Sequence, residues 1–329
     1  MKVAVVYNRP RLEGNDAALC SADVLTQVEA VRESLVELGH EPVLVALSRQ
    51  DAVRLPATLR GAGVECAVNL CESLDEDNRL QGHVAVLYEL AGVPYTGSDM
   101  LALSLTTDKY LAKRVMAAAG VPTPKFALYT GGGSLETEQL KFPVIAKPRF
   151  EDGSVGIEED SVAADRRGLE AVLKRLEPRY GDILVEEYVA GRELYAALLG
   201  HPEAECLPVS EIDLAALAHR PYQVVGYRAK WVEESPEFSA TPRLFPAEDA
   251  ATRTVREVAR RCFRLFGLRD YARVDVRLDA ALTPHVLEVN ANPCLSPEGG
   301  YAAALERAGI SFRQFVERLL GYALARRAA

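Results

Sequence analysis

The stretch RVDVRLDAALTPHVLEVNANP, residues 273–293, decides the fold. Apolar and polar residues alternate in 274–278 and again in 286–289, and the residues between these runs favour a turn. This period of two predicts a β-hairpin with one polar face. Asp275, Glu288 and Asn290 would converge on that face.

These three side chains form an all-oxygen ligand set, with no histidine or cysteine beside them. Such a set suits Mg²⁺ or Mn²⁺ better than Zn²⁺, and it usually holds the metal of a nucleoside triphosphate. An ordinary amphipathic hairpin with solvated acidic residues would explain the hairpin alone equally well. The sequence upstream of the hairpin favours the metal site.

Length and charge exclude several classes of protein. The chain has 329 residues, of which 49% are hydrophobic, so it can bury a large core in two or three compact units. Its 47 acidic and 38 basic residues give a net charge of −9, which argues against nucleic acid as a partner. No apolar run approaches the ~20 residues of a membrane span, and the apolar start is too short for a signal sequence. We therefore expect a cytoplasmic protein that does not enter a membrane.

Six cysteines lie scattered along the chain, with no pair at the spacing of a metal or redox motif. Reduced, buried thiols are the expected state. Cys294 follows the hairpin closely and could contact a substrate, although a packing role is favoured for it.

The first hundred residues predict an open parallel sheet. Strands are expected at 2–7, 43–47 and 66–70, with helices at 22–38 and 50–62 between them. This βαβαβ order predicts a doubly wound sheet, whose ligands bind beyond the carboxyl ends of the strands, here 7–13 and 69–77. No glycine-rich loop follows the first strand, so a dinucleotide site is not expected.

Two further helices, at 81–91 and 108–119, flank a loop of turn residues at 92–99. We place a domain boundary near Leu105. The predicted units are an amino-terminal domain of residues 1–104, a central subdomain of 105–185 and a carboxyl-terminal subdomain of 186–329.

A phosphate-binding element is predicted in the central subdomain. The strand 142–148 ends at Lys147, and the loop 150–156 (FEDGSVG) is rich in small residues, including Gly153 and Ser154. A lysine beside exposed backbone N–H groups is suited to phosphate. The same residues are also common in surface turns.

The carboxyl-terminal subdomain begins with strands at 183–188 and 194–199. Glu186 and Glu187 end the first of these and could face an adenine and ribose, or lie on a solvated edge. A strand at 222–231, a proline-containing loop at 233–246, a helix at 252–266 and two helices within 301–328 are expected to follow.

Taken together, these motifs resemble the ATP-grasp ligases and, among them, the D-alanyl-D-alanine ligases. The resemblance rests on Asp108-Lys109, Lys147-Pro148, the loop 153–156, residues 186–193, Lys230 and the hairpin. It extends to LQG at 80–82, GRE at 191–193 and AGISF at 308–312. The implied fold is mixed α/β and α+β, an ATP-grasp fold preceded by an open parallel α/β domain. The implied assembly is a homodimer.

The resemblance also implies a role for each motif. ATP would be bound by Lys109, Lys147, Ser154, Glu186, Glu187, Tyr188, Val189, Glu193 and Lys230. Two Mg²⁺ ions, for which Mn²⁺ could substitute, would be bound by Asp275, Glu288 and Asn290. Arg273 would face the oxyanion that forms when an amine attacks an acyl phosphate, with Lys230 on the γ-phosphate side and Gly299 at the acceptor site. The substrates would be a small carboxylate and an amine, such as amino acids or peptides.

Departures from the family fall in the substrate site. The family's donor-binding glutamate, serine and tyrosine are replaced at Ala22, Gly153 and Trp231, with Asp23 and Glu29 near the first. A histidine-glycine pair is replaced by Glu72-Ser73. The serine that receives the acceptor carboxylate is replaced by Gly299, between Glu298 and Gly300. These departures predict a donor that is bulkier or less polar than D-alanine.

Three alternative functions would use some of the same motifs, and each meets an objection. A true D-alanine:D-alanine ligase of cell-wall synthesis would need other residues to replace the lost donor site. A small-molecule kinase would have no tetrahedral carbon intermediate for Arg273 to stabilise. A non-catalytic nucleotide-binding module would have lost a metal ligand or a phosphate lysine, and all of these are present.

Overall fold

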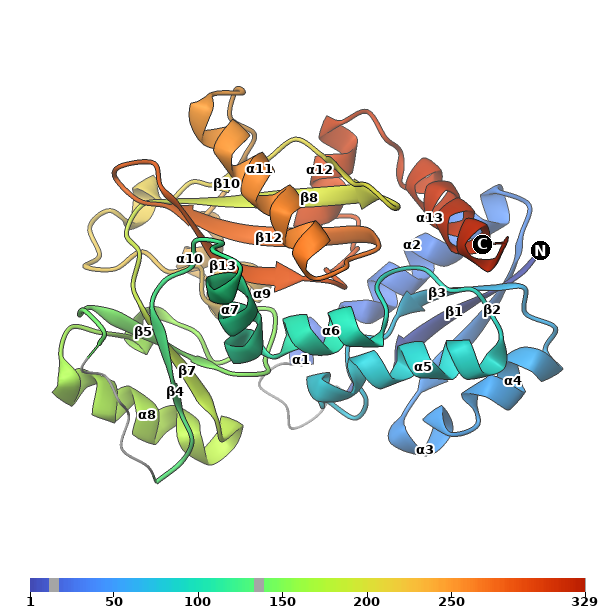
Figure 1. Ribbon diagram of the computed structural model, residues 1–329, viewed down its shortest axis with the longest axis horizontal. Helices are drawn as coiled ribbons and strands as arrows, with labels where there is room; N and C mark the ends of the chain where they lie inside the picture. Colours follow the sequence, from blue (N-terminus) through green and yellow to red (C-terminus); the bar gives the residue numbers. More distant parts are fainter. Residues whose placement is uncertain (12–17, 133–138, 329) are drawn as a thin grey trace.

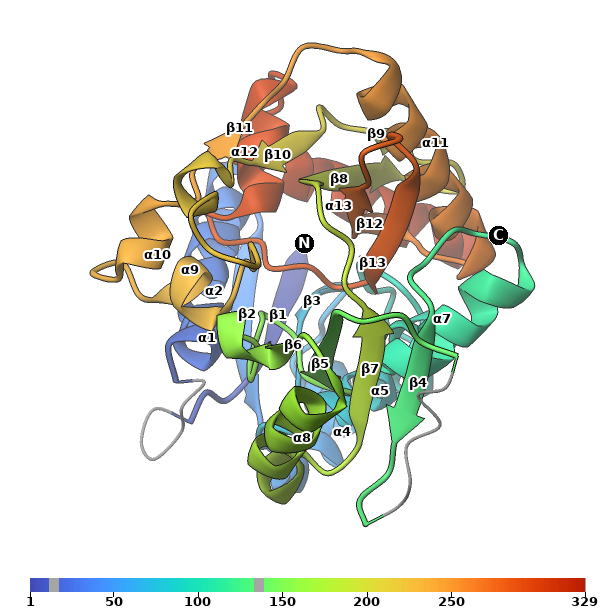
Figure 2. The same ribbon diagram turned by 90° about the vertical axis from the view of Figure 1, so that its left-hand side faces the viewer.

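Three β-sheets organise the chain, each covered by helices (Figure 1). The computed structural model describes residues 1–11, 18–132 and 139–328. The first sheet belongs to the amino-terminal domain, and the second and third stand on either side of a central space when the molecule is turned by 90° (Figure 2). This arrangement confirms the predicted mixture of α/β and α+β architecture.

The predicted hairpin is present as β12 (Asp270–Leu278) and β13 (Pro284–Asn290). Asp275 lies opposite Glu288 and Arg273 lies opposite Asn290, so all four side chains share one face. The register shifts by one residue after Asp275, where Leu287 has no partner in β12. Such a bulge changes the local twist and redirects neighbouring side chains.

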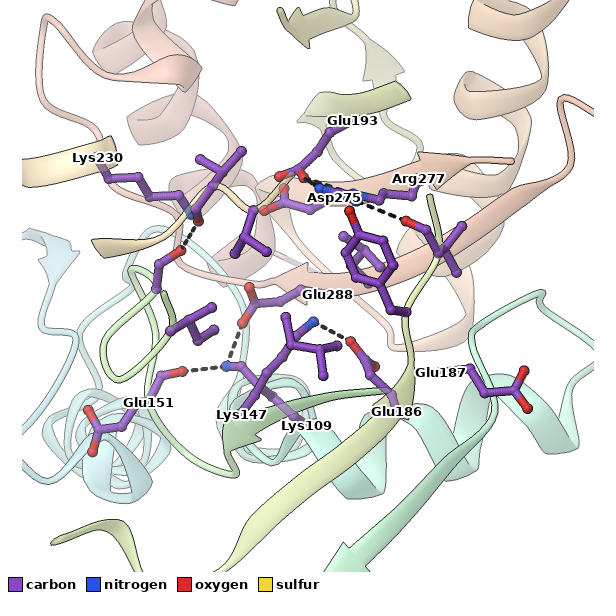
Figure 3. A pocket seen from close by; sticks show the side chains of 18 residues that line it. Lys109, Lys147, Glu151, Glu186, Glu187, Glu193, Lys230, Asp275, Arg277 and Glu288 are labelled. Carbon is purple, nitrogen blue, oxygen red and sulfur yellow. Dashed lines mark hydrogen bonds and ion pairs between the residues drawn. The ribbon is translucent and has the colours of Figure 1, made fainter. Parts of the chain in front are cut away.

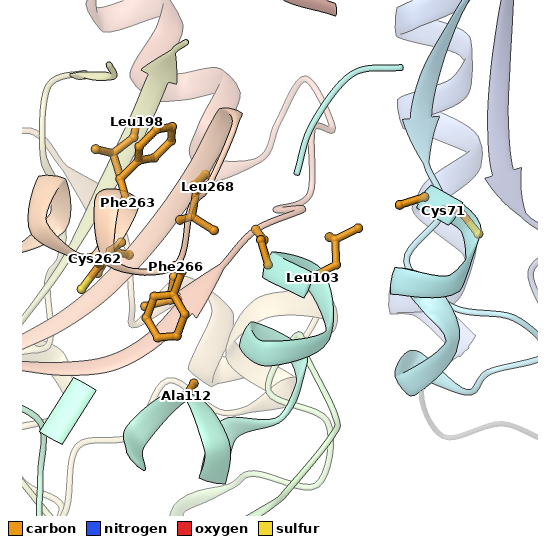
Figure 4. Close-up of a cluster of buried hydrophobic side chains, with 14 of the residues drawn as sticks. Cys71, Leu103, Ala112, Leu198, Cys262, Phe263, Phe266 and Leu268 are labelled. Atoms are coloured by element: carbon orange, nitrogen blue, oxygen red, sulfur yellow. The ribbon is translucent and has the colours of Figure 1, made fainter. Parts of the chain in front are cut away.

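The hairpin belongs to a six-stranded antiparallel sheet. Its strand order is β11-β10-β8-β12-β13, and β9 pairs with β8. The other strands are β8 (Arg192–Gly200), β9 (Glu205–Cys206), β10 (Ser210–Ile212) and β11 (Arg243–Leu244). One face packs on α11 (Ala250–Leu265), where Phe263 contributes to a cluster with Leu198 (Figure 4). The alternation of strand residues then directs Arg273, Asp275 and Arg277 to the opposite face.

The central sheet is four-stranded, in the order β4-β7-β5-β6. It comprises β4 (Phe126–Tyr129), β5 (Val144–Pro148), β6 (Val162–Ala163) and β7 (Ile183–Glu187). Val144, Ala146 and Val185 pack on α8 (Arg166–Tyr180). Lys147 and Glu186 have the opposite parity, so they project from the face that α8 does not cover.

The amino-terminal sheet is parallel, with β1 (Lys2–Asn8) between β2 (Glu41–Leu47) and β3 (Cys66–Leu70). Val3 and Val5 pack toward α2 (Val24–Glu37), which follows the short α1 (Ala18–Ala22). Ala4 and Val6 pack toward α4 (Leu55–Gly61) and α5 (Gln81–Ala91). Helices therefore cover both faces, which explains the continuous apolar run of β1.

The single helix predicted for residues 50–62 is two helices, α3 (Arg49–Ala52) and α4. Ser48 and Asp51 form a capping box at the start of α3. Pro56 lies in the first turn of α4, where its missing N–H is not needed. The proline thus starts a second helix where the periodicity suggested one continuous element.

The strand predicted for residues 222–231 is wrong. Residues 227–231 form α9 (Tyr227–Trp231), and the preceding valines lie in an irregular segment. Arg277 and Tyr188 donate hydrogen bonds to the Gln223 carbonyl, and Tyr227 N donates to Ile157 O. These contacts override the β-propensity of the two valines. The following loop contains α10 (Pro236–Ser239) and the edge strand β11.

Two helices connect the amino-terminal and central units. They are α6 (Met100–Thr107) and α7 (Lys109–Ala118), and Asp108 caps α7 by accepting hydrogen bonds from its first turn. Leu105 lies within α6. The proposed domain boundaries stay a prediction.

The chain ends with α12 (Gly300–Arg307) and α13 (Phe312–Ala328), as predicted. α13 returns to the amino-terminal domain, where Phe315 and Leu319 share a core with Val3 and Val31. Figure 1 shows α13 beside α2. Among the described residues, no helix combines the length and apolarity needed to cross a membrane.

A buried ion pair holds α13 against the amino-terminal domain. Asp270, at the start of β12, is fully buried and forms a bidentate pair with Arg326 of α13, whose Nη2 lies 2.9 Å from Asp270 Oδ2. Gly97 N donates to the same carboxylate at 2.7 Å, and Arg326 Nη2 donates to Tyr95 O. The pair therefore joins the hairpin, the last helix and the amino-terminal domain.

Replacing Arg326 with alanine should destabilise the protein by about 3–5 kcal/mol, because it leaves a buried carboxylate without its cation. Urea denaturation followed by circular dichroism would measure the change in free energy of unfolding. Arg318→Ala is the matched control on the same helix, since its pair with Glu205 is exposed and should contribute less than about 1 kcal/mol. Equal effects of the two substitutions would contradict the role given to Asp270.

Candidate functional site

A central pocket lies between the exposed faces of the second and third sheets (Figure 3). Lys147 and Glu186 enter it from the central sheet, and Asp275 and Glu288 enter it from the hairpin. Tyr188 and Val189 follow β7 along its side. The pocket thus gathers side chains from segments more than 150 residues apart in the sequence.

A buried ion triad forms the wall on the side of the central sheet. Glu186 contacts both Lys113 Nζ, at 2.7 Å, and Lys147 Nζ. The side chains of Lys113 and Glu186 are each about 1% exposed. Burial opposes ionisation of Glu186, but the two lysines outweigh it and lower the pKa of its carboxyl group. The triad holds Lys147 in place and leaves one net positive charge at this wall.

A second cluster surrounds Lys109, the first residue of α7. Its Nζ lies 2.6 Å from Glu288 Oε1, 2.9 Å from Asp152 Oδ1 and 2.5 Å from the Glu151 carbonyl. Burial acts against its charge, yet the two carboxylates raise the pKa of Lys109. Although Glu288 is also buried, Lys109 lowers its pKa to about 2, whereas burial raises the pKa of Asp152 to about 6. Lys109 therefore joins the loop 150–156 to the hairpin through ion pairs.

The polar face of the hairpin carries an arginine beside the predicted metal ligands. Arg273 Nε and Nη2 lie 2.7 and 3.0 Å from the two oxygens of Asp275, and the guanidinium stands over the Tyr195 ring. The side-chain nitrogen of Asn290 is buried without a hydrogen-bond partner. Among the described residues, this nitrogen is therefore free to turn toward a ligand.

This face fits a magnesium ion that arrives with phosphate. The described residues contain no cluster of three or more histidine, cysteine, aspartate or glutamate side chains arranged to hold a metal alone. Two carboxylates, each already paired with a cation, and one amide make a partial set. Mg²⁺ commonly takes one or two protein carboxylates together with substrate phosphates and water. The donor set therefore suits Mg²⁺ bound with a nucleotide.

Arg277 is a pocket residue that the sequence analysis missed. It is 4% exposed, and its Nε and Nη2 lie 3.0 and 2.8 Å from Glu193 Oε2. It also donates hydrogen bonds to the carbonyls of Val189 and Gln223, at 2.8 and 2.6 Å. Burial opposes its charge, but Glu193 raises the pKa of Arg277. One buried cation thus fixes three segments that line the pocket.

All nine predicted nucleotide-binding residues line this pocket. They are Lys109, Lys147, Ser154, Glu186, Glu187, Tyr188, Val189, Glu193 and Lys230, together with the metal-ligand candidates Asp275 and Glu288. The Glu187 side chain points away from the pocket, where it accepts a hydrogen bond from Lys141 N (Figure 3). Ser154 Oγ donates to Val225 O, which ties the loop 150–156 to the segment before α9.

The predicted donor site is filled differently from the expectation. Cys20, rather than Ala22, is the residue of the first helical segment that faces Gly153. A Cβ atom at residue 153 would lie 2.8 Å from Cys20 Sγ and 3.4 Å from the Trp231 indole nitrogen. Trp231 Nε1 donates to Gly153 O at 2.8 Å. Cys20 and Trp231 therefore occupy the space beside Gly153.

The remaining predicted substrate residues lie beyond the hairpin. Asp23 accepts hydrogen bonds from Ser296 Oγ and Cys294 Sγ, at 2.5 and 3.0 Å, so it contacts the loop after β13. Gly299 N donates to Ser296 O and is not available to a substrate. The Glu298 side chain is exposed, and Gly300 begins α12.

Arg243, which the sequence analysis also missed, lies beside Gly300. A Cβ atom at residue 300 would lie 3.5 Å from the Arg243 guanidinium. Burial, followed by the nearby charge of Arg273, lowers the pKa of Arg243. Arg243 therefore lies beside the first residue of α12.

A second cavity adjoins the central pocket and is lined by acidic and polar groups. We call it the acidic chamber; its lining is Asn8, Cys20, Ser21, Glu72, Ser73, Glu76, Asn78, Glu151, Asp152, Val155, Arg179 and Tyr180. Trp231 lines neither cavity. Carboxylates and other polar groups thus surround the space next to the central pocket, and the expectation of a bulkier or less polar donor stays a prediction.

Comparison with known proteins agrees with these motifs. Residues 115–321 match the family model described as D-ala D-ala ligase C-terminus. An uncharacterized protein of Sinorhizobium fredii, y4sG, is 36% identical over 304 residues, which cover 90% of this chain and 86% of that protein. A D-alanine–D-alanine ligase of Moorella thermoacetica is 30% identical over 334 residues, covering 98% of this chain and 99% of the relative.

Solved structures agree at the level of the fold. The crystal structure of a D-alanine–D-alanine ligase from Bacillus anthracis complexed with ATP superposes with a TM-score of 0.79. The identity is 20%, and the match covers 100% of this chain and 99% of the other. The predicted ATP-grasp fold is confirmed.

Replacing Arg277 with methionine should raise the dissociation constant for ATP, the ligand predicted for the central pocket, by about tenfold or more. The substitution keeps the volume but leaves Glu193 buried without a cation and the Val189 carbonyl without its donor. Isothermal titration with Mg-ATP would measure the change. Arg192→Met, which removes a more exposed pair with Glu211 on β8, is the control. Unchanged affinity in Arg277→Met would contradict the role assigned to this residue.

Proposed function

Because the chain belongs to the D-alanyl-D-alanine ligase-like family of ATP-grasp enzymes and is an ATP-dependent ligase, we propose that it joins a carboxylate to an amine through an acyl phosphate, with a donor other than D-alanine. The observation that carries this proposal is the meeting of Cys20, Gly153 and Trp231 at the place where a donor-binding glutamate, serine and tyrosine are expected. The reaction class follows from the family, and the donor from this departure.

In this proposal the central pocket binds ATP. Lys147, held by Glu186, and Lys109 would contact phosphate oxygens. Backbone groups at 186–189 would face the adenine, and Glu193 would face the ribose. Lys230 would lie on the γ-phosphate side. The buried ion pairs support this assignment, since they fix the cations before the nucleotide binds and reduce the cost of ordering them.

The hairpin would hold two Mg²⁺ ions through Asp275, Glu288 and Asn290. When bound, the metal would neutralise charge on the transferring phosphoryl group. Lys109 now contacts Glu288 at 2.6 Å, so binding of the metal would compete with this ion pair. The same lysine would then be available to the phosphates.

The second half-reaction is attack of the amine on the acyl phosphate. The tetrahedral intermediate carries an oxyanion, and Arg273 would supply fixed positive charge beside it. Its bidentate contact with Asp275 and its position over Tyr195 support this role because they restrict the guanidinium to one orientation. Loops 150–156 and 233–246 would exclude water while the acyl phosphate waits.

The acceptor would bind at the start of α12. The Gly299 N–H already donates to Ser296 O. The Gly300 N–H and the Arg243 guanidinium would therefore bind the acceptor carboxylate instead. Arg243 approaches Gly300 and has no carboxylate partner among the described residues. The homodimer and the cytoplasmic location implied by the sequence stay predictions.

A true D-alanine:D-alanine ligase remains the second candidate. It is favoured by relatives that carry this name, such as the proteins of Carboxydothermus hydrogenoformans and Moorella thermoacetica, each 30% identical to this chain. In that case Asp23 or Glu72 would have to replace the lost glutamate.

Mg-ATP-dependent phosphate release, measured across a panel of amino acids and amines with mass spectrometry of the products, tests the donor. We expect amide products with donors other than D-alanine and little turnover when D-alanine is the only amino acid present. Both enantiomers of each amino acid belong in the panel, and omission of ATP is the control. A preference for D-alanine over every other donor would refute the proposal in favour of the second candidate.

Substituting Arg273 with alanine should slow condensation by about 10²–10³-fold and slow phosphorylation much less. The expected sign is phosphate release without an equal amount of amide, because the acyl phosphate is then hydrolysed. Arg273→Lys is the matched variant, since it keeps a charge but loses the bidentate contact with Asp275. If both half-reactions fell equally in Arg273→Ala, the role of Arg273 would be in the first step.

A further inference from the structure

The acidic chamber contains carboxylates that the proposed mechanism does not use. Glu72 follows β3, and its Oε1 accepts a hydrogen bond from Gln27 Nε2 at 3.1 Å. Glu151 belongs to the loop 150–156, and its Oε2 accepts a weak bond from Asn78 Nδ2 at 3.4 Å. Within the described residues neither carboxylate has an ion-pair partner. For Glu72 the stabilising partner is thus the amide of Gln27, whereas the charge of Lys109 also acts on Glu151.

Glu72 thereby differs from four carboxylates of the central pocket. In the pocket, Glu186, Glu193, Asp275 and Glu288 each contact a lysine or arginine. In the chamber, burial raises the pKa of both Glu72 and Glu151 to about 7. A cationic ligand would restore the ionised form of either carboxylate and gain a charge-assisted hydrogen bond.

Two hydrogen-bond donors in the chamber also lack partners. Asn8 is 4% exposed and Ser73 is 5% exposed, and both line the cavity. Asn8 Oδ1 accepts from Glu72 N, but no described group accepts a hydrogen bond from Asn8 Nδ2 or is bonded to the Ser73 hydroxyl. Polar groups this deeply buried are normally satisfied. They lie at the carboxyl ends of β1 and β3, where an open parallel sheet binds ligands.

The chamber is connected to the reacting centre. Glu151 borders both cavities, with its carbonyl toward Lys109 and its carboxylate directed away from the central pocket (Figure 3). Asp152 stands between the two spaces, because it contacts Lys109 near Glu288 and its charge also raises the pKa of Glu72. Asp152 therefore lies between Glu72 and Glu288, beside which the carboxylate would react. A cation bound at Glu72 has to reach past Asp152, which suits the end of a side chain better than the α-ammonium, whose nitrogen is two bonds from the carboxylate carbon.

We propose that the acidic chamber binds a cationic side chain, an ammonium or amidinium, of the carboxylate substrate, and that Glu72 is the residue that selects it. This inference rests on the proposed function, since it assigns the class of donor for the same reaction. Asn8 and Ser73 would bond an oxygen of the substrate or a water molecule beside the cation. Glu151 would supply the second negative charge at the outer end of the chamber.

Lysine and norleucine are the probes, because norleucine has the same carbon chain without the ε-ammonium. Both enantiomers would be compared as donors by kcat/KM in the presence of Mg-ATP and the amine acceptor identified by the panel. We expect a preference for lysine of about 10- to 100-fold in the unmodified enzyme. Glu72→Gln, which can still accept from Gln27, should abolish this preference while retaining turnover of norleucine. Glu170→Gln, at an exposed position on α8, is the control.

Protection against thermal unfolding by lysine, without ATP, gives a readout independent of catalysis. If no amino acid is condensed, but lysine still raises the unfolding temperature and Glu72→Gln removes this effect, the proposed ligase function is refuted and the cation site in the chamber is supported. If amides form with equal efficiency from lysine and norleucine, or if Glu72→Gln leaves the preference for lysine intact, the chamber has no such role and the ligase proposal stands.

Discussion

The ammonium of Lys109 is the charge on which the arrangement of the site depends. It meets Glu288 of the hairpin, Asp152 of the loop 150–156 and the Glu151 carbonyl, and so uses all three of its hydrogen-bond donors. Lys109 is itself the first residue of α7, which Asp108 caps. A single buried cation therefore links α7, the loop 150–156 and the hairpin. Binding of any more highly charged group must rearrange these contacts, and this couples occupancy of the pocket to the position of the loop.

Elements with a strong local pattern could be predicted from the sequence. The hairpin was identified because its alternation matches burial on α11, and α5 coincides with its predicted range. The errors have tertiary causes. Val224 and Val225 favour a strand, but carbonyl contacts from Arg277 and Tyr188 hold the segment in irregular form. The packing of α13 on the amino-terminal sheet joins the two ends of the chain, a contact that no local window of sequence contains.

In the candidate site, too, residues within short motifs could be predicted from the sequence, whereas residues placed by tertiary contacts could not. Lys147, Glu186 and Glu288 belong to short motifs that carry their own signal, and they meet in one pocket. Arg277 has no such motif. Its position two residues after Asp275, on the same strand face, was a usable signal, but only the fold shows that Glu193 and Val189 lie within its reach. Likewise, the contact of Cys20 with Gly153 depends on how the first helical segment packs against the loop 150–156. Sequence matching had placed Ala22, two residues later, at this position.

The carboxylates of the central pocket and those of the acidic chamber differ in their partners. This difference would suit the two spaces to different ligands. In the central pocket Glu186, Glu193, Asp275 and Glu288 are each paired with a cation, so these cations are fixed and little reorganisation would be needed if phosphate entered. In the acidic chamber Glu72 is stabilised by an amide, a weaker partner that a cation can outcompete. Its position follows from topology, because β1 and β3 both end there and direct Asn8 and Ser73 to one edge. In the proposed function the ion pairs of the central pocket would position ATP, and the amino-terminal sheet would form one wall of the substrate site. Residues of that wall could then change without disturbing the ion pairs.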